Sequence, residues 1–333
     1  MAVITADINC PSKAGLDLNA TRSMKVKLKS DVRWGDRVFR RLMMLAAVSL
    51  LFLTLAFAIF LGMAGWESLA RSGLAFFVNS QWDPVQEDFG ALAVVYGTVV
   101  SSMLAIMLAT PVGIGVALFT TDIASKPVAR IVGFFVEMLA AIPSVVFGLF
   151  GVFVLVPFLR TWIEPPLIEW LGWFPLFAGP PFGVGMLAAG VILAIMILPT
   201  ISSICREVFR AVDQSQREAA LALGATRWEM MFVAVLRGTR TGTWGAIILA
   251  LGRALGETMA VTMVIGNRTE IVTSLFAPAQ TMASVIANEY AEATSDIHLS
   301  ALAAVGLTLF GVTIIVNGLA KFLIWQVTRE RVR

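Results

Sequence analysis

Two oppositely charged residues lie inside an apolar stretch of the sequence. Arg253 and Glu257 occur in ALGRALGETMA, within residues 243–265, which otherwise read as a membrane-spanning helix. A charge at the centre of a bilayer costs on the order of 3 kcal/mol, so such residues are rare and usually paired. Positions four apart share one helix face, which predicts an ion pair between the two side chains. Because arginine offers a planar fork of donors to oxyanions, the pair either lies on a transport path or is a structural ion pair that fixes helix packing.

A third ionisable side chain, Glu137, lies in another apolar stretch, residues 131–159. It is a second candidate partner for Arg253, although its place near the expected cytoplasmic end also allows simple exposure to water. The chain has one histidine, His298, which precedes the last apolar stretch. A single histidine outside the spans argues against Ser-His or Cys-His catalysis and against histidine-based metal sites. We therefore expect no catalytic residue and no metal site, and a surface or helix-start role for His298.

The composition is that of an integral membrane protein. The chain of 333 residues is 58% hydrophobic and 14% charged, with a mean hydropathy of +0.84, whereas soluble domains carry about 25% charged residues. Six stretches are long enough to cross a hydrocarbon core, which needs about 20 helical residues. They are residues 42–62, 91–119, 131–159, 185–204, 243–265 and 301–325. The expected fold class is all-α, in one six-helix transmembrane domain.

The domain boundaries and the orientation follow from the spans and the positive charges. We expect a basic N-terminal segment at residues 1–41, the transmembrane domain at residues 42–325 and a tail at residues 326–333. The segments that would lie on the side of both termini hold 21 of the 25 Lys and Arg residues, and the opposite side holds three. This asymmetry predicts that both termini are cytoplasmic. The N-terminal segment is either an ordinary orientation signal with a loosely ordered tail or an interfacial segment attracted to anionic lipids.

Several other features carry expectations of their own. Residues 163–183, on the expected outer side, are rich in Trp, Phe and Pro, which fits an interfacial anchor or a docking surface for an external partner. Four glycines are expected to allow close helix approach: Gly113, Gly115, Gly252 and Gly256.

The long cytoplasmic loop between the fourth and fifth spans, residues 205–242, has a helical period with a glycine in the middle. Its stretch REAALALGATRWEMMFVAVLRG suggests two short helices joined at Gly224. Such a unit either docks its apolar patch into a groove on a partner or lies as a surface helix on the membrane. Periodicity alone favours the surface helix.

The residues of this loop resemble the EAA motif of the permeases of ATP-binding-cassette importers. The motif residues are Glu218, Ala219 and Ala220, followed by Gly224. In that family the loop docks into a cleft on a separate ATPase subunit. One departure is that Arg237 stands where the family usually has a proline.

Further stretches resemble the phosphate-specific permeases of the PstC type within that family. They are EMLAAIPSVVFGLFG, TPVGIGVALFTTD, GRALGETMAVTMVIGN and IANEYAEA, and the resemblance runs from about residue 92 to residue 321. It implies the helical bundle of a type I importer permease in a bacterial inner membrane, with Arg253 and Glu257 on the phosphate path. The implied partners are a PstA-like second permease, a PstB-like ATPase dimer, a PstS-like external phosphate-binding protein and membrane lipid, with no nucleic acid.

Several other functions are alternatives to phosphate import. The sequence has no Gly-Lys dipeptide, so it lacks the phosphate-binding loop of an ATPase, and we expect ATP and Mg²⁺ only on a partner subunit. Arg253 alone does not distinguish phosphate from sulfate or molybdate. A stand-alone ion-coupled transporter usually has an internal repeat, which we do not find. An intramembrane protease would need histidines that the spans lack.

Overall fold

The structure is a computed structural model that describes the backbone of residues 18–329 and the side chains of residues 34–322, 324 and 325. The other parts of the expected N-terminal segment and C-terminal tail lie outside the described residues. The chain divides into two compact units, residues 1–59 and residues 60–333.

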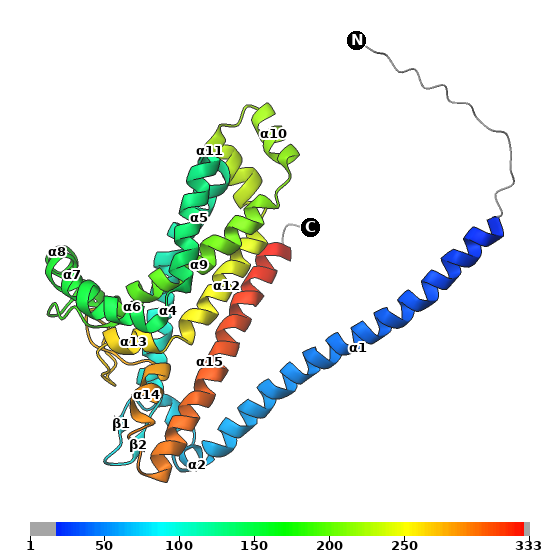
Figure 1. The fold of residues 1–333 in the computed structure, drawn as a ribbon. Coiled ribbons are helices and arrows are strands. Elements are labelled where there is room, and N and C mark those ends of the chain that lie inside the picture. Colours follow the sequence, from blue (N-terminus) through cyan, green and yellow to red (C-terminus); the bar gives the residue numbers. More distant parts are fainter. Residues whose placement is uncertain (1–17, 330–333) are drawn as a thin grey trace. The chain divides into compact units, whose positions relative to one another are not determined.

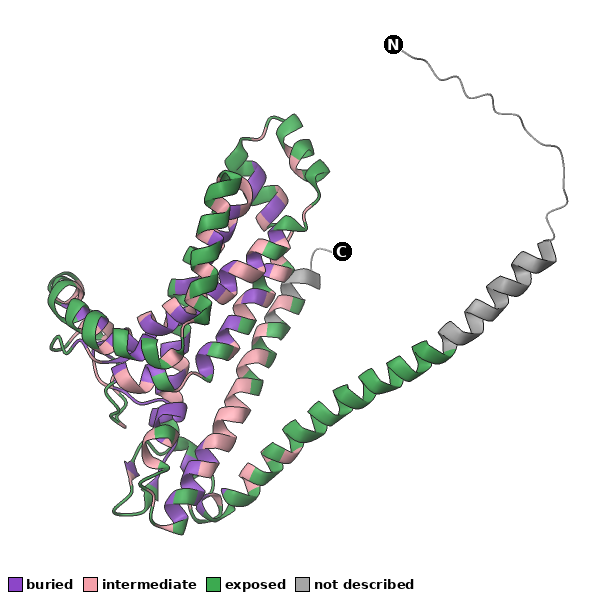
Figure 2. Ribbon diagram, in the orientation of Figure 1, coloured by how far each residue is buried: buried purple, intermediate pink, exposed green. Residues whose placement is uncertain are grey.

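The first unit contains most of α1 (Leu18–Ala64), so the helix begins well before the first expected span. Its part Trp34–Ala64 is long and apolar enough to cross a membrane. No residue from 34 to 59 is buried (Figure 2), although the stretch is rich in Leu, Phe and Met. A helix that is apolar on every side needs apolar surroundings, so these side chains suit contact with lipid or with a partner subunit.

The second unit is helical apart from one short hairpin, in which Trp82 of β1 pairs with Phe89 of β2. Its first half contains α2 (Trp66–Ser72), α3 (Ala75–Val78), β1 (Trp82–Asp83), β2 (Asp88–Phe89), α4 (Leu92–Leu118), η1 (Phe119–Ile123), α5 (Lys126–Ala141), α6 (Ser144–Phe150), η2 (Gly151–Leu155), α7 (Val156–Phe158), η3 (Leu159–Ile163) and α8 (Glu164–Leu171). Its second half contains η4 (Pro175–Phe177), α9 (Met186–Arg210), α10 (Gln214–Ala222), α11 (Arg227–Met230), η5 (Met231–Leu236), α12 (Arg240–Leu255), α13 (Met259–Val264), α14 (Met282–Glu289) and α15 (Asp296–Arg329). The η elements are π-helical turns, except η4, which is a 3₁₀ turn.

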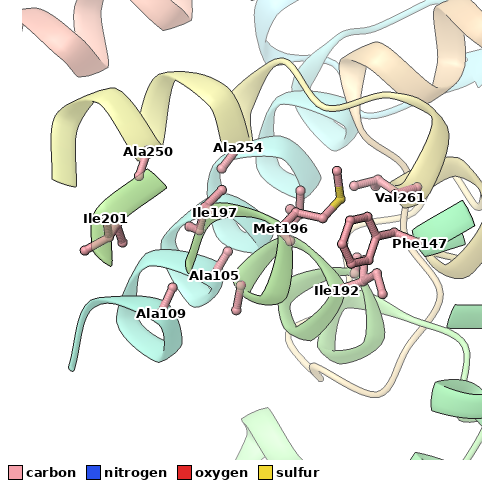
Figure 3. Close-up of a cluster of buried hydrophobic side chains, with 14 of the residues drawn as sticks. Ala105, Ala109, Phe147, Ile192, Met196, Ile197, Ile201, Ala250, Ala254 and Val261 are labelled. Carbon is pink, nitrogen blue, oxygen red and sulfur yellow. The ribbon is translucent and has the colours of Figure 1, made fainter. Parts of the chain in front are cut away.

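The core of the second unit forms around α9, which packs against α4, α5, α12 and α13 (Figure 1). Figure 3 shows Ile197 of α9 among small side chains of its neighbours, Ala105 and Ala109 of α4 and Ala250 and Ala254 of α12, all buried. Helices in a membrane gain no hydrophobic driving force from contact with one another, because the lipid is itself apolar. Small residues let their backbones approach closely, so that van der Waals packing holds the helices together. The alanines of α4 and α12 therefore explain why these two helices lie close to α9.

Only one of the four glycines expected to allow close helix approach does so. A Cβ built on Gly113 would lie 2.8 Å from Cγ2 of Ile201, whereas one built on Gly115 would meet nothing within 4 Å. At Gly252 and Gly256 the nearest atoms would be 3.7 and 3.8 Å away, which is ordinary contact. The prediction is confirmed at Gly113 and wrong at the other three positions, because only Gly113 faces the interface between α4 and α9.

We expect Gly113→Ala to lower the free energy of unfolding by about 1–3 kcal/mol, the usual range for overpacking a tight interface. The β-branched Ile201 side chain is stiff and has little freedom to move aside. Gly115→Ala, two residues along the same helix on an exposed face, is the matched control and should change stability little. Thermal unfolding of the purified protein in detergent measures both, and equal stability of the two variants would contradict this account of the interface.

The third expected span, residues 131–159, is not one helix. α5 ends at Ala141, Ile142 is extended, and Pro143 is the N-cap of α6. Proline disfavours helical geometry at the residue before it, so the break falls at Ile142. The helix long enough to cross a membrane is instead Ser144–Leu171, which joins α6 to α8 through the π-helical turns η2 and η3.

The fifth expected span is also divided. α12 ends at Leu255 and α13 begins at Met259, so neither is as long as a spanning helix. Within residues 18–329, five helical stretches are long and apolar enough to cross a membrane: Trp34–Ala64, Leu92–Ile123, Ser144–Leu171, Met186–Arg210 and Asp296–Phe322. The all-α membrane fold is confirmed, and the expected division into six continuous spans is not.

Candidate functional site

Arg253 and Glu257 lie on either side of the break between α12 and α13. Arg253 is exposed in the last turn of α12, and Glu257 is half-buried in the connection that follows Gly256. Among the described side chains, no ion pair joins the two. The expected pairing on one helix face is therefore wrong, because the helix does not continue through both positions. Glycine costs a helix about 1 kcal/mol relative to alanine, which favours an end at this point.

No ion pair with another described side chain occupies the guanidinium of Arg253, so it is available to bind a group from outside the chain. An uncompensated cation within an apolar layer is costly, so it favours an anionic partner. Arginine suits an oxyanion because its five N–H donors are held in a fixed, planar arrangement. Of the ionisable residues in α12, Arg253 therefore has the chemistry and exposure expected of a substrate-binding cation.

Asn317 of α15 is a further candidate, which the sequence alone did not reveal. Its Oδ1 is buried and has no hydrogen-bond partner among the residues that the structure describes. A Cβ built on Gly252, the residue before Arg253, would lie 3.7 Å from Nδ2 of Asn317. A buried polar atom without a partner costs free energy, so this amide beside Gly252 of α12 is a candidate for binding a group from outside the chain. The only signal in the sequence is one amide within an apolar run.

Glu137 does not pair with Arg253. Its Oε1 lies 2.8 Å from Nη2 of Arg206, a residue of α9, and its side chain is 66% exposed. Arg206 can lie against α5 because Gly133 has no side chain; a Cβ there would be 2.4 Å from Nη1. The interpretation of Glu137 as a second partner of Arg253 is therefore wrong, and its exposure supports the alternative that it simply faces water.

The loop after α9 folds as the two short helices expected from its period. α10 and α11 are joined at Gly224, whose φ of +88° is a conformation that residues with a side chain rarely adopt. Thr226 caps α11: its hydroxyl accepts a hydrogen bond from the N–H of Glu229, whose carboxylate accepts one from the N–H of Thr226. The carboxylate of Glu229 accepts this bond from the N–H of Thr226 and a second one from the Thr226 hydroxyl, and the two, the backbone one first, lower the pKa of Glu229. The cap is therefore formed near neutral pH and is lost as the pH falls through that pKa.

The residues of the EAA motif lie mainly on the outer face of α10. Glu218 and Ala219 are exposed, and Ala220 is half-buried against the core. Leu223 is 90% exposed and Trp228 is 67% exposed. We call α10 and α11 with the turn between them, residues 214–230, the coupling segment. Exposed apolar side chains on a short, capped helical unit are what a groove-binding segment presents.

A buried ion pair fixes the coupling segment to the end of α4. A carboxylate oxygen of Asp122, in η1, pairs with Arg217 of α10, and the two side chains are 2% and 13% exposed. Arg217 Nη2 also donates to the carbonyl oxygen of Phe209 at the end of α9, at 2.6 Å. Thr121 donates its hydroxyl to the second oxygen of Asp122 at 2.7 Å. Burial lowers the pKa of Arg217, but arginine keeps its charge at any physiological pH.

The ion pair joins α10 to η1, which is distant in the sequence, and the bond to Phe209 joins α10 to the end of the preceding helix, α9. A movement of α10 would be transmitted to the ends of α4 and α9 through Arg217, because breaking a buried pair costs about 3–5 kcal/mol. The sequence contains Asp122 and Arg217 but gives no sign that they meet.

Residues 109–328 match the family model described as the inner membrane component of binding-protein-dependent transport systems. The chain belongs to this family. The match includes the coupling segment, Arg253 and Glu257, and together with the five apolar helices it makes the chain an integral membrane protein.

Two relatives of this inner membrane component are similar to it over nearly their whole length. The phosphate transport system permease protein PstC of Mesorhizobium japonicum is 46% identical over 314 residues, 93% of this chain and 96% of the relative. The protein of that name from Pasteurella multocida is 43% identical over 302 residues, 90% and 94% of the two chains. A solved chain of a bacterial ABC transporter involved in the import of the polysaccharide alginate has a TM-score of 0.60 at 15% identity, covering 91% of this chain and 99% of that one. It shows that the fold is that of an ABC importer permease.

The one histidine of the chain lies in a buried cluster, at the end of the second unit opposite to the coupling segment (Figure 1). His298 Nε2 lies 2.9 Å from Oε2 of Glu289, which also accepts a hydrogen bond from Nε1 of Trp82 at 2.8 Å. Phe89 stacks on the His298 ring. The cluster joins the hairpin to α14 and to the start of α15 (Figure 1). His298 is therefore a packing residue in the first turn of α15, in agreement with the expected helix-start role.

The Trp-rich segment has a partly helical structure. α8 occupies residues 164–171, and the side chains of Trp162, Trp170 and Trp173 are 71–81% exposed. Glu164 is buried and accepts a hydrogen bond from the N–H of Gly183 at 2.9 Å, which ties the segment together. Such exposed indole rings fit an interfacial anchor and a docking surface equally well.

Proposed function

We propose that this chain is a membrane-spanning permease subunit of an ATP-driven importer of inorganic phosphate. The observation that carries this proposal is the 46% identity, over 93% of the chain, to a phosphate transport system permease protein. The importer fold, the coupling segment and the exposed Arg253 support it.

In the proposed mechanism, the chain forms half of the translocation path and takes energy from a partner. Exposed Arg253 binds the dehydrated anion, and Asn317 lies nearby with an unused acceptor for a protonated phosphate oxygen. ATP hydrolysis on a separate subunit moves the coupling segment, and the Asp122–Arg217 pair passes that movement to α4 and α9. The chain itself carries out no hydrolysis and binds neither ATP nor Mg²⁺.

The proposed partners are a PstA-like second permease, a PstB-like ATPase dimer and a PstS-like external phosphate-binding protein. Both termini are proposed to be cytoplasmic in a bacterial inner membrane, as the distribution of Lys and Arg indicates. This orientation puts the coupling segment on the side where ATP is available.

Copurification and uptake together test this function. Purification of the chain from native membranes should bring an ATPase and a second permease with it, and loss of the chain should abolish ATP-dependent uptake of labelled phosphate. Excess sulfate or molybdate should not compete. Competition by sulfate at equal concentration, or purification without an ATPase, would contradict the proposal and favour another oxyanion or a stand-alone transporter.

We expect Glu218→Lys to uncouple ATP hydrolysis from transport. Glu218 is exposed on α10 and accepts a hydrogen bond from Gln214 at 3.2 Å, so the change reverses a charge on the face offered to the ATPase without disturbing the core. Hydrolysis should continue while uptake per ATP falls at least about tenfold, the effect of losing one charged contact.

The matched control for this prediction is Gln216→Lys, which adds a lysine to the same helix. Positions two apart do not share a helix face, so this variant should keep the ratio of uptake to hydrolysis. ATPase activity and phosphate uptake are measured on the same reconstituted complex. If Glu218→Lys leaves the ratio of uptake to hydrolysis unchanged, the coupling segment does not dock on the ATPase through Glu218, and the alternative of a helix lying on the membrane is favoured.

A further inference from the structure

A cavity of about 600 Å³ lies between η1, the first three turns of α5 and the end of α9. Its charged lining consists of four cations and one carboxylate: Lys126, Arg130, Arg206, Arg210 and Glu137. The volume falls within the range of cavities that hold small ligands. The cavity is next to the coupling segment, since Thr121 in its wall bonds to the Asp122 carboxylate that holds Arg217.

The positions of these charges follow from helical spacing. Lys126 and Arg130 are one turn apart on α5, and Arg206 and Arg210 are one turn apart on α9, so each pair shares one face. Gly133 lets α9 bring the Arg206 guanidinium against α5. The two faces meet across the cavity, which concentrates positive charge there.

The carboxylate that lines the cavity and the one beside its wall are both already paired. Glu137 is paired with Arg206 and Asp122 with Arg217. Among the described side chains, Lys126, Arg130 and Arg210 have no ion-pair partner. The hydroxyls of Thr120 and Thr121 donate to acceptors within the chain, so the cations supply the free donors of the cavity.

We propose that this cavity binds a phosphate group, from either an anionic phospholipid or free inorganic phosphate. The group's oxygens match the unpaired guanidinium and ammonium donors. Basic pockets between helices at the cytoplasmic side of a membrane are suited to lipid headgroups, and the exposed Phe134 in the wall would contact acyl chains. Free phosphate in this cavity would be the transported ion, bound there after it has left Arg253. Only this free-phosphate source rests on the proposed function; the lipid source does not.

The test compares the complex with Arg130→Gln/Arg210→Gln to the complex with Arg227→Gln/Arg237→Gln. Both changes remove two exposed arginines, and the control pair lies outside the cavity. Every sample also carries Arg253→Gln, which removes the proposed path cation from the comparison. The complexes are placed in phosphatidylcholine nanodiscs without nucleotide or external binding protein, so that transport activity does not enter the measurement.

Two arms separate the two sources. One measures binding of radiolabelled inorganic phosphate by equilibrium dialysis, and the other measures retention of added phosphatidylglycerol by mass spectrometry. The cavity variant should bind at least about tenfold more weakly in one arm, as expected for the loss of charged hydrogen bonds. A loss in the first arm identifies free phosphate, and a loss in the second identifies the lipid headgroup. No loss in either arm, or an equal loss in the control pair, overturns the proposal.

A variant that is expected to strengthen binding provides an independent check. Glu137→Gln removes the carboxylate from the cavity and releases Arg206 from its ion pair. Binding in the same arm should become tighter, at least about threefold, because the net charge of the cavity rises by one. Weaker or unchanged binding in this exposed-site variant overturns the proposal even if the double variant does not assemble.

Discussion

Arg253→Gln should abolish phosphate uptake while the transport complex still assembles. Arg253 is exposed at the end of α12, and no ion pair among the described side chains depends on it, so its loss leaves the packing of the helices unchanged. Glutamine keeps a donor but loses the charge and the planar fork. Two charged hydrogen bonds to a dehydrated phosphate are worth about 1.5–3 kcal/mol each, so uptake should fall at least about a hundredfold.

Uptake of labelled phosphate into reconstituted vesicles measures this effect, and size-exclusion chromatography reports assembly. The matched control is Arg71→Gln, which removes an arginine whose exposed ion pairs with Glu67 and Glu87 contribute little. The control should transport at the normal rate. Uptake at the normal rate in Arg253→Gln would remove Arg253 from the path, and failure of that variant to assemble would show that the arginine is structural.

Arg217→Gln should have the second large effect, on both stability and coupling. It leaves the carboxylate of Asp122, only 2% exposed, without its counter-ion. Removing one partner of a buried pair costs about 3–5 kcal/mol, so the complex should melt at a lower temperature. Because α10 also loses its bond to the carbonyl of Phe209, uptake per ATP hydrolysed should fall at least about tenfold.

The double variant Asp122→Asn/Arg217→Gln separates positioning from simple instability. It removes the buried charge as well, so most of the thermal stability should return, while the uptake per ATP remains low because the ion pair is still absent. Arg227→Gln, an exposed arginine of the same coupling segment, should keep both stability and coupling. Recovery of full coupling in the double variant would show that the pair stabilises the fold without transmitting movement.

The parts of the site that could be predicted are those set by local sequence. The two helices of the coupling segment follow from the helical period and from Gly224, whose positive φ fits a residue without a side chain. The apolar membrane helices follow from composition. Pro111 and Pro199 lie inside α4 and α9, whereas Pro143 lies at the break between α5 and α6. The sequence does not separate these cases, because the neighbouring helices decide whether the freed backbone groups are satisfied.

The parts that could not be predicted depend on contacts between distant residues or on small differences in backbone energy. The sequence does not show clearly that α12 ends at Leu255, because the glycine that follows costs a helix only about 1 kcal/mol. Asp122 and Arg217 meet although 95 positions separate them, and Arg206 reaches Glu137 across 69. Spacing along one helix pointed to Glu257 as the partner of Arg253, and the tertiary structure supplied different partners for the other charges.

The π-helical turns η2 and η3 affect how single-residue insertions and deletions can alter this permease during evolution. Each replaces the usual i→i+4 bonding with i→i+5 bonding, so the side chains after it are rotated relative to a regular helix. Gain or loss of one codon there would convert a wide turn to a regular one, or the reverse, and would turn the tryptophan-bearing end of the helix towards a new direction. Relatives could therefore diversify this tryptophan-bearing surface by length changes of a single residue, while the alanine-lined centre around α9 stays the same.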